Sequence, residues 1–160
     1  MINVMFVCHG NICRSPMAEM ILKELARRRG IADSLLIASR GTSDEEIIRG
    51  VGNPIYPPAQ RILREKGIPF EERRAVQLCA ADYDRFDLLI GMERVNLRNM
   101  GRICGGDPKG KFRLLLAYTG ENRDVSDPWY TRDFAHAYDD IFRGCTALLD
   151  ALTAEQGGGV

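Results

Sequence analysis

Short apolar runs rich in β-branched and aromatic residues alternate along this chain with longer segments whose apolar residues follow helical spacing. We predict strands at residues 3–7, 35–39, 74–78, 87–91 and 111–117. Helices are predicted at residues 16–29, 59–66, 93–100 and 134–152. The Gly- and Pro-rich segment 41–58 is predicted to be a long loop. This alternation is typical of α/β proteins, in which helices cover both faces of a parallel sheet.

The length of the chain suits one domain with one sizeable core, since it has 160 residues. Neither an internal repeat nor a linker divides it. We therefore expect a single domain over residues 1–154, followed by a flexible C-terminal tail over residues 155–160.

The composition argues against several classes of protein. Lys plus Arg and Asp plus Glu both number 22, so a general surface for nucleic acid or anionic membranes is not expected. The sequence contains neither a run that would span a membrane nor a recognisable signal peptide. Five cysteines are an odd number in a chain long enough to fold without disulfides, which argues against a disulfide framework. They form no C-x-x-C pair, and His9 and His136 are far apart in the sequence, which argues against a zinc site. We expect a cytoplasmic protein, monomeric or at most weakly dimeric.

The sequence VCHGNICRSP, residues 7–16, connects the first predicted strand to the first predicted helix. Ligands of parallel α/β sheets bind at this edge, and the N-terminus of a helix presents N–H groups to an anion. Arg14 adds a planar guanidinium that can hold two phosphate oxygens. Positive surroundings lower a thiol pKa from ~8.5 to roughly 3.5–7.5, so we expect Cys8 to be a thiolate. The segment thus predicts a loop that binds a dianion and attacks it with sulfur.

Three further residues of this loop have predicted structural roles. Ser15 is expected to be the N-cap of the helix and to donate a hydrogen bond to the Cys8 thiolate. Pro16 is expected at the first helical position. Asn11 tolerates a positive φ and is expected to help the loop curl. The alternative interpretation of Cys8, a small apolar residue at the end of a strand, leaves the neighbouring glycine and arginine unexplained.

Hydrolysis of a phosphate ester also needs an acid that protonates the leaving oxygen. Two Asp-Pro pairs are candidates. Asp107 precedes the last predicted strand and is expected at the opposite edge of the sheet. Asp127 follows that strand and is expected at the edge that carries Cys8. Trp129 and Tyr130 follow Asp127 directly and are placed to form a wall for a ring-bearing substrate.

The segments VCHGNICRSPMAE and SDPWY together resemble the low-molecular-weight protein tyrosine phosphatases. The resemblance extends over nearly the whole chain through GNP, AQRILREKGI, FDLLIGM and NLR. It implies a single-domain four-stranded parallel sheet with flanking helices, a phosphotyrosine phosphatase I-like, Rossmann-like fold. It also implies hydrolysis of phosphotyrosine in protein substrates, and of small aryl phosphates, without a metal or cofactor.

The resemblance also implies roles for individual residues. Cys8 forms a phosphocysteine intermediate, Arg14 binds the phosphate, and Asp127 acts as acid and then as base. Cys13 is the implied redox partner, whose reversible disulfide with Cys8 protects the nucleophile from deeper oxidation. The remaining members of the predicted phosphate loop are His9, Gly10, Asn11, Ile12, Cys13 and Ser15. The substrate ring is expected to lie against Ile12, Trp129 and Tyr130.

The chain departs from the family pattern around the mouth of the predicted site. The loop after GTS is longer than usual, and DEEII replaces the usual aromatic residue. IYPPAQ stands where a segment like DPRAQ is usual, and RRAVQL replaces H-x-A-R-Q. Glu93 stands where aspartate is usual. These departures concern substrate choice, and the acidic residues 44–46 predict a bias against acidic peptides.

Three alternative functions are weighed against this one. Protein-arginine phosphatases of the same family usually have a threonine after the loop asparagine and lack the aromatic pair. Here Ile12 and the pair Trp129-Tyr130 favour a flat aryl group. Arsenate reductases share the fold but need further cysteines, and Cys79 lacks a close downstream partner. A non-catalytic phosphopeptide-binding module would not need an intact nucleophile, arginine and acid.

Overall fold

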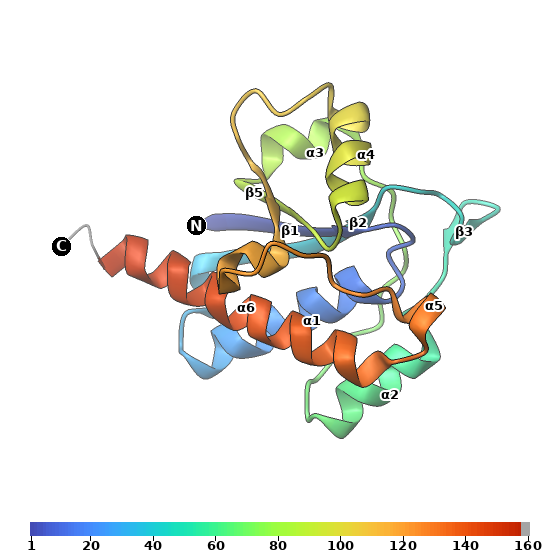
Figure 1. Cartoon of the computed structure of the whole chain (residues 1–160), viewed down its shortest axis with the longest axis horizontal. Helices are drawn as coiled ribbons and strands as arrows, with labels where there is room; N and C mark the ends of the chain where they lie inside the picture. Colours follow the sequence, from blue (N-terminus) through green and yellow to red (C-terminus); the bar gives the residue numbers. More distant parts are fainter. Residues whose placement is uncertain (158–160) are drawn as a thin grey trace.

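Four of the five predicted strands form one sheet and run parallel to one another (Figure 1). The computed structural model describes residues 1–157. The strand order is β2-β1-β5-β6, so the first strand of the chain lies inside the sheet. The strands are β1 (Ile2–Cys8), β2 (Leu35–Gly41), β5 (Leu88–Gly91) and β6 (Phe112–Leu114). The predicted four-stranded parallel sheet is confirmed.

Helices cover both faces of the sheet because the side chains of each strand alternate between the faces. Val4 and Phe6 of β1 pack into a core with α1, α2 and α6, whereas Met5 and Val7 pack into a second core with α3 and α4. The helices are α1 (Arg14–Arg28), α2 (Pro57–Glu65), α3 (Ala80–Arg85), α4 (Arg94–Cys104) and α6 (Phe134–Gly157). A strand buried on both faces explains the uninterrupted apolar run at the start of the sequence.

Two strand predictions were wrong or too long. Residues 74–78 make only a single bridge to the sheet, between Gln77 and Gly41. The last strand, predicted over 111–117, ends at Leu114 and continues as the 3₁₀ helix η2 (Leu115–Thr119). Leu115 and Leu116 are buried in η2, and a short buried run has the same apolar pattern in either conformation.

The predicted loop over 41–58 contains an unpredicted hairpin, formed by β3 (Ile47–Ile48) and β4 (Val51–Gly52). Its turn residues Arg49 and Gly50 have φ values of 53° and 78°. Two successive positive φ values are typical of the tight type I′ turn that joins antiparallel strands. An arginine at the first of these positions is not a common hairpin signal, so the sequence did not predict the hairpin.

The remaining elements are short and were not predicted: α3, the 3₁₀ helix η1 (Ala32–Ser34) and α5 (Pro128–Thr131). The predicted tail, residues 155–160, lies partly outside the described residues, and α6 extends as far as Gly157. Among residues 1–157, no helix combines the length and the apolar character that crossing a membrane requires.

Candidate active site

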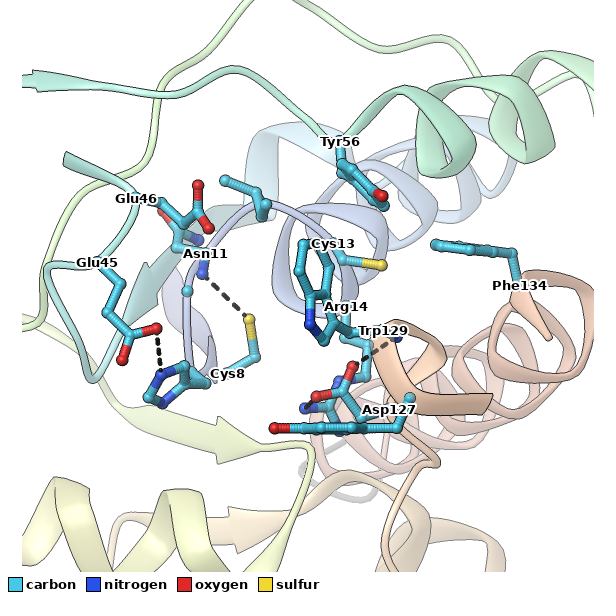
Figure 2. Close-up of a pocket in the computed structure, with 14 residues that line it drawn as sticks. Cys8, Asn11, Cys13, Arg14, Glu45, Glu46, Tyr56, Asp127, Trp129 and Phe134 are labelled. Carbon is cyan, nitrogen blue, oxygen red and sulfur yellow. Dashed lines mark hydrogen bonds and ion pairs between the residues drawn. The ribbon is translucent and has the colours of Figure 1, made fainter. Parts of the chain in front are cut away.

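The loop after β1 surrounds the sulfur of Cys8 with hydrogen-bond donors (Figure 2). Cys8 is the last residue of β1, and only 3% of it is exposed. The Asn11 N–H donates to Cys8 Sγ at 3.3 Å. The Ser15 hydroxyl lies 2.9 Å from the same sulfur. These contacts are the ones that would stabilise a negative sulfur at the floor of a pocket.

The first helix begins earlier than predicted. Its first residue is Arg14, so Ser15 is the second helical residue and Pro16 the third; the predictions of an N-cap at Ser15 and of Pro16 at the first position were wrong. Cys13 is the N-cap, and its carbonyl accepts from the Met17 N–H at 3.0 Å. The Ser15 hydroxyl is engaged by its neighbours in the loop and does not cap the helix. Proline is tolerated in the first turn because the N–H groups there have no intrahelical acceptor.

Asn11 holds the loop in its curled shape. It is fully buried and has a φ of 60°, which confirms the predicted positive φ. Its side-chain amide donates to Ser15 Oγ at 2.9 Å and to Ser39 Oγ at 3.0 Å. Gly41 makes this approach of β2 to the loop feasible, because a Cβ there would lie 2.8 Å from the His9 carbonyl oxygen. The loop is therefore fixed to the end of β2.

Arg73 clamps Asn11 from outside the loop and was missed by the sequence analysis. Its guanidinium donates to the Asn11 backbone oxygen at 2.7 Å and also to Asn11 Oδ1. The Val76 N–H donates to the same Oδ1 at 2.9 Å. Burial lowers the pKa of Arg73, while the nearby Glu19 and Cys8 act in the opposite direction. A second cation thus lies close enough to Cys8 for the two groups to interact electrostatically.

A chain of hydrogen bonds leads from the loop to the surface. Ser39 donates to Glu19 Oε1 at 2.6 Å, and Lys23 donates to Glu19 Oε2 at 2.7 Å. Lys23 also contacts Glu71 at 2.7 Å. The buried carboxylate of Glu19 is therefore neutralised and hydrogen-bonded, as a buried charge needs to be.

Arg14 is buried at the base of the pocket, with 3% of its side chain exposed. Its guanidinium donates to the Val125 carbonyl at 2.8 Å and lies 2.5 Å from Glu93 Oε1. It also lies 3.4 Å from Asp127 Oδ2. Burial by itself would lower the pKa of Arg14. The adjacent negative groups, led by Cys8, more than compensate, so the pKa lies above its ordinary value.

The two Asp-Pro pairs lie in different environments. Asp127 is the N-cap of α5 and accepts from the Trp129 N–H at 3.0 Å, and 27% of its side chain is exposed. It lines the same cavity as Cys8. Asp107 instead accepts hydrogen bonds in the turn before β6, from the Tyr83 hydroxyl and from the N–H groups of Lys111 and Phe112. Asp127, which was predicted at the sheet edge that carries Cys8, therefore lies beside Arg14. Asp107 instead stabilises the turn before β6.

The cavity above the loop has a volume of about 430 Å³. All of the predicted site residues except Ser15 line it: Cys8, His9, Gly10, Asn11, Ile12, Cys13, Arg14, Asp127, Trp129 and Tyr130. Ser15 lies behind the sulfur. Four further residues line the cavity: Glu45 and Glu46, which were predicted only to bias substrate choice, and Tyr56 and Phe134, which were not predicted. They belong to segments distant in the sequence, which no local pattern connects to the loop.

The rim of the cavity has an acidic side and an aromatic side (Figure 2). Glu45 lies 3.1 Å from His9 Nε2, and 68% of its side chain is exposed. Glu46 accepts from the Asn53 side chain at 2.8 Å and packs against Gly10. Across the cavity, 56% of Trp129 and 82% of Tyr130 are exposed.

Cys13 lines the same cavity as Cys8, and both are free thiols. Burial raises the pKa of Cys13 well above its ordinary value, and the neighbouring Cys8 adds to this effect. Cys13 is therefore held in the protonated form. Cys79, Cys104 and Cys145 lie elsewhere in the fold.

Comparison with known proteins agrees with this arrangement of fold and site. The family model of the low molecular weight phosphotyrosine protein phosphatases matches residues 3–157. The low molecular weight protein-tyrosine-phosphatase YfkJ of Bacillus subtilis is 37% identical, over 98% of this chain and 99% of its own. PtpA of Staphylococcus aureus, which has the same class name, is 36% identical over 97% of this chain and 96% of its own.

Solved structures show the same relationship. The crystal structure of YfkJ from Bacillus subtilis superposes with a TM-score of 0.91, covering 97% of this chain and 96% of that one. A Drosophila arginine phosphatase is 30% identical and superposes with a TM-score of 0.81, over 93% of this chain and 96% of that one. The chain therefore belongs to the low molecular weight phosphotyrosine protein phosphatase family. It is a phosphoric monoester hydrolase of the protein-tyrosine-phosphatase class.

Proposed function

We propose that this protein hydrolyses phosphotyrosine in protein substrates, and small aryl phosphates, through a phosphocysteine intermediate on Cys8. The observation that carries the proposal is a single cavity that contains the Cys8 sulfur, the Arg14 guanidinium and the Asp127 carboxylate. Aromatic side chains line the same cavity, so a phosphate on the loop would carry its aryl group against them.

The first step transfers the phosphoryl group to sulfur. The Cys8 thiolate attacks phosphorus, forming the S–P bond, and the P–O bond to the phenol breaks. Protonated Asp127 gives its proton to the leaving oxygen. Arg14 and the N–H groups of the loop hold the three remaining phosphoryl oxygens, where negative charge gathers in the transition state.

The second step returns the enzyme to its starting state. Asp127, now a carboxylate, takes a proton from water, and the water oxygen attacks phosphorus. The S–P bond breaks, inorganic phosphate leaves, and the Cys8 thiolate is restored. The Ser15 hydroxyl, 2.9 Å from Cys8 Sγ, supports sulfur as the leaving group by donating a hydrogen bond to it.

Phosphoarginine is the second candidate substrate, since a relative of known structure is an arginine phosphatase. Two features favour phosphotyrosine. Ile12 presents an apolar side chain rather than a hydroxyl, and Trp129 and Tyr130 present flat rings at the rim. A phosphoserine side chain is too short to reach these rings while its phosphate lies on the loop.

The test compares one peptide sequence that carries phosphotyrosine, phosphoarginine or phosphoserine at the same position. We expect efficient release of phosphate from phosphotyrosine and poor release from the other two. A higher kcat/KM on phosphoarginine, or equal values on phosphoserine, would overturn the proposed substrate. Cys8→Ser serves as the background control for contaminating phosphatases.

We further propose reversible oxidation at Cys8 and Cys13, which share the cavity. Peroxide converts the Cys8 thiolate to a sulfenic acid and releases hydroxide. The Cys13 thiol then displaces water and forms a disulfide, which a thiol reductant cleaves. The cytoplasmic location and the monomeric state stay predictions from the sequence.

A further inference from the structure

Tyr56 occupies a position whose side chain is not needed to cap a helix. It is the N-cap of α2, yet it makes no side-chain capping hydrogen bond. Pro57 and Pro58 follow it and have no N–H groups to satisfy. The Tyr56 carbonyl accepts from the next two N–H groups, those of Ala59 at 2.9 Å and Gln60 at 3.0 Å. The Tyr56 side chain therefore has no role in capping α2.

The backbone of Tyr56 fixes this ring beside the phosphate loop. The Tyr56 N–H donates to the Ile12 carbonyl at 2.8 Å, which ties the start of α2 to the loop. The ring centroid lies 5.4 Å from that of Trp129 and 5.9 Å from that of Phe134. Tyr56, Ile12, Trp129 and Phe134 all line the cavity. Figure 2 shows Tyr56 and Phe134 on the side of Cys13 away from the acidic side of the rim.

We propose that Tyr56 is a specificity-determining residue that forms the fixed wall of the aryl slot. Trp129 belongs to a helix of four residues and is half exposed, so it is less firmly held than a ring anchored by α2. A flat substrate ring packs favourably against such a wall, whereas a ligand without a ring gains nothing from it. The inference rests on the proposed function, because it assigns the substrate class of the same site.

The experiment measures binding rather than turnover, in a Cys8→Ser background. The ligands are benzylphosphonate, which has a ring, and inorganic phosphate, which has none. Trp129 is the single tryptophan of the chain and contacts Tyr56, so its fluorescence reports binding. Tyr56→Phe keeps the ring, Tyr56→Leu keeps apolar volume without a flat face, and Phe70→Leu removes a ring that packs on the same core but lies outside this cavity.

We expect Tyr56→Leu to weaken benzylphosphonate about 3- to 10-fold, the size of one aromatic contact, and to leave phosphate affinity within about twofold. Tyr56→Phe and Phe70→Leu should leave both affinities unchanged. If Tyr56→Leu loses affinity equally for both ligands, Tyr56 supports the loop and does not contact the substrate ring. If it loses affinity for neither ligand, Tyr56 does not form part of the slot. Either result overturns the inference. Failure of the parent to hydrolyse phosphotyrosine peptides would instead overturn the proposed function.

Discussion

The floor and the rim of the cavity are built in different ways. On the floor, Asn11 and Arg14 are buried, and each has several hydrogen-bond partners drawn from distant parts of the chain. At the rim, Trp129, Tyr130 and Glu45 are largely exposed. A buried polar group that loses a partner carries a large penalty, whereas an exposed group can exchange its partner for water. The residues of the floor therefore tolerate little change. The residues of the rim can vary, and we expect them to distinguish one substrate from another.

The sharpest test of the floor is the nucleophile itself. Cys8→Ser should reduce turnover to background while retaining phosphate or vanadate binding, because the loop N–H groups and Arg14 are unchanged. In the parent, iodoacetate near pH 6 should alkylate Cys8 and spare Cys13, whose pKa is raised mainly by burial. Phosphate should block the reaction. Mass spectrometry locates the label, and substantial turnover by Cys8→Ser would refute the assignment of the nucleophile.

The next largest effect concerns Asp127, which stands between floor and rim. Asp127→Asn should lower kcat roughly 10²–10⁴-fold for substrates whose leaving group needs a proton. The loss should grow as the leaving phenol becomes more basic, measured over a series of aryl phosphates under single-turnover conditions. A loss that is the same for every phenol would show that another group is the acid.

Asp107→Asn is the matched control for that experiment. Asp107 accepts three hydrogen bonds in its turn, so the change should lower the free energy of unfolding by about 1 kcal/mol. We expect kcat to be nearly unchanged and the dependence on the leaving group to match that of the parent. A greater loss of kcat here than in Asp127→Asn would reverse the two assignments.

Much of the floor could be predicted from the sequence because its parts are local. The loop Cys8–Ser15 is continuous, and the strand edge rule placed Asp127 rather than Asp107 beside it. The contact between Ser15 and Cys8 was predicted and is present, but the capping role was wrong because the helix begins at Arg14, one residue before Ser15. The start of a helix is thus less well determined by the local sequence than the contacts within the loop.

The rest of the site could not be predicted because separate loops supply it. Tyr56 and Phe134 lie in segments whose local patterns indicate only a helix start, and Glu45 lies in a loop whose path depends on an unpredicted hairpin. Arg73 was noted only as a departure from a family pattern. Its contact with Asn11 spans 62 residues of sequence.

The third prediction concerns how Cys13 protects Cys8 from irreversible oxidation. Mild peroxide should inactivate the parent, and a thiol reductant should restore most of its activity. Cys13→Ser should be inactivated without recovery, because no thiol remains in the cavity to capture the oxidised sulfur of Cys8. Mass spectrometry should find the Cys8–Cys13 disulfide in the parent and sulfinic or sulfonic acid in the variant. Equal recovery of the two proteins would leave Cys13 with a packing role only.

The fourth prediction concerns Arg73, which supports the floor of the cavity through its contacts with Asn11. Arg73→Met removes both contacts with Asn11, and we expect kcat/KM to fall about tenfold, in keeping with about 1–2 kcal/mol for buried groups left without partners. Phosphate affinity should fall with it. Arg73→Lys keeps the charge without the planar fork and should recover only part of the activity. Arg74→Met, a neighbouring and more exposed arginine, is the control, and an equal loss there would contradict the role of Arg73.

The smallest effect belongs to the acidic rim. Glu45 and Glu46 add two carboxylates to the cavity that we propose binds the phosphate dianion, so a peptide with lysine next to phosphotyrosine should be hydrolysed faster than one with glutamate. Because Glu45 is exposed, each charge contact is worth little, and we expect a preference of a few-fold. High salt should weaken it.

The variant that isolates this effect is Glu45→Gln, which should reduce the lysine-over-glutamate preference and leave kcat/KM for p-nitrophenyl phosphate within about twofold, since a small aryl phosphate brings no charge to the rim. Glu72→Gln makes the same change of charge outside the cavity and should leave the preference intact. If Glu72→Gln lowers the preference as much as Glu45→Gln does, net charge and not the rim selects the peptide. If neither variant changes the preference, the Glu45 carboxylate is not its source, and the proposed recognition of charge at the acidic side of the rim is wrong.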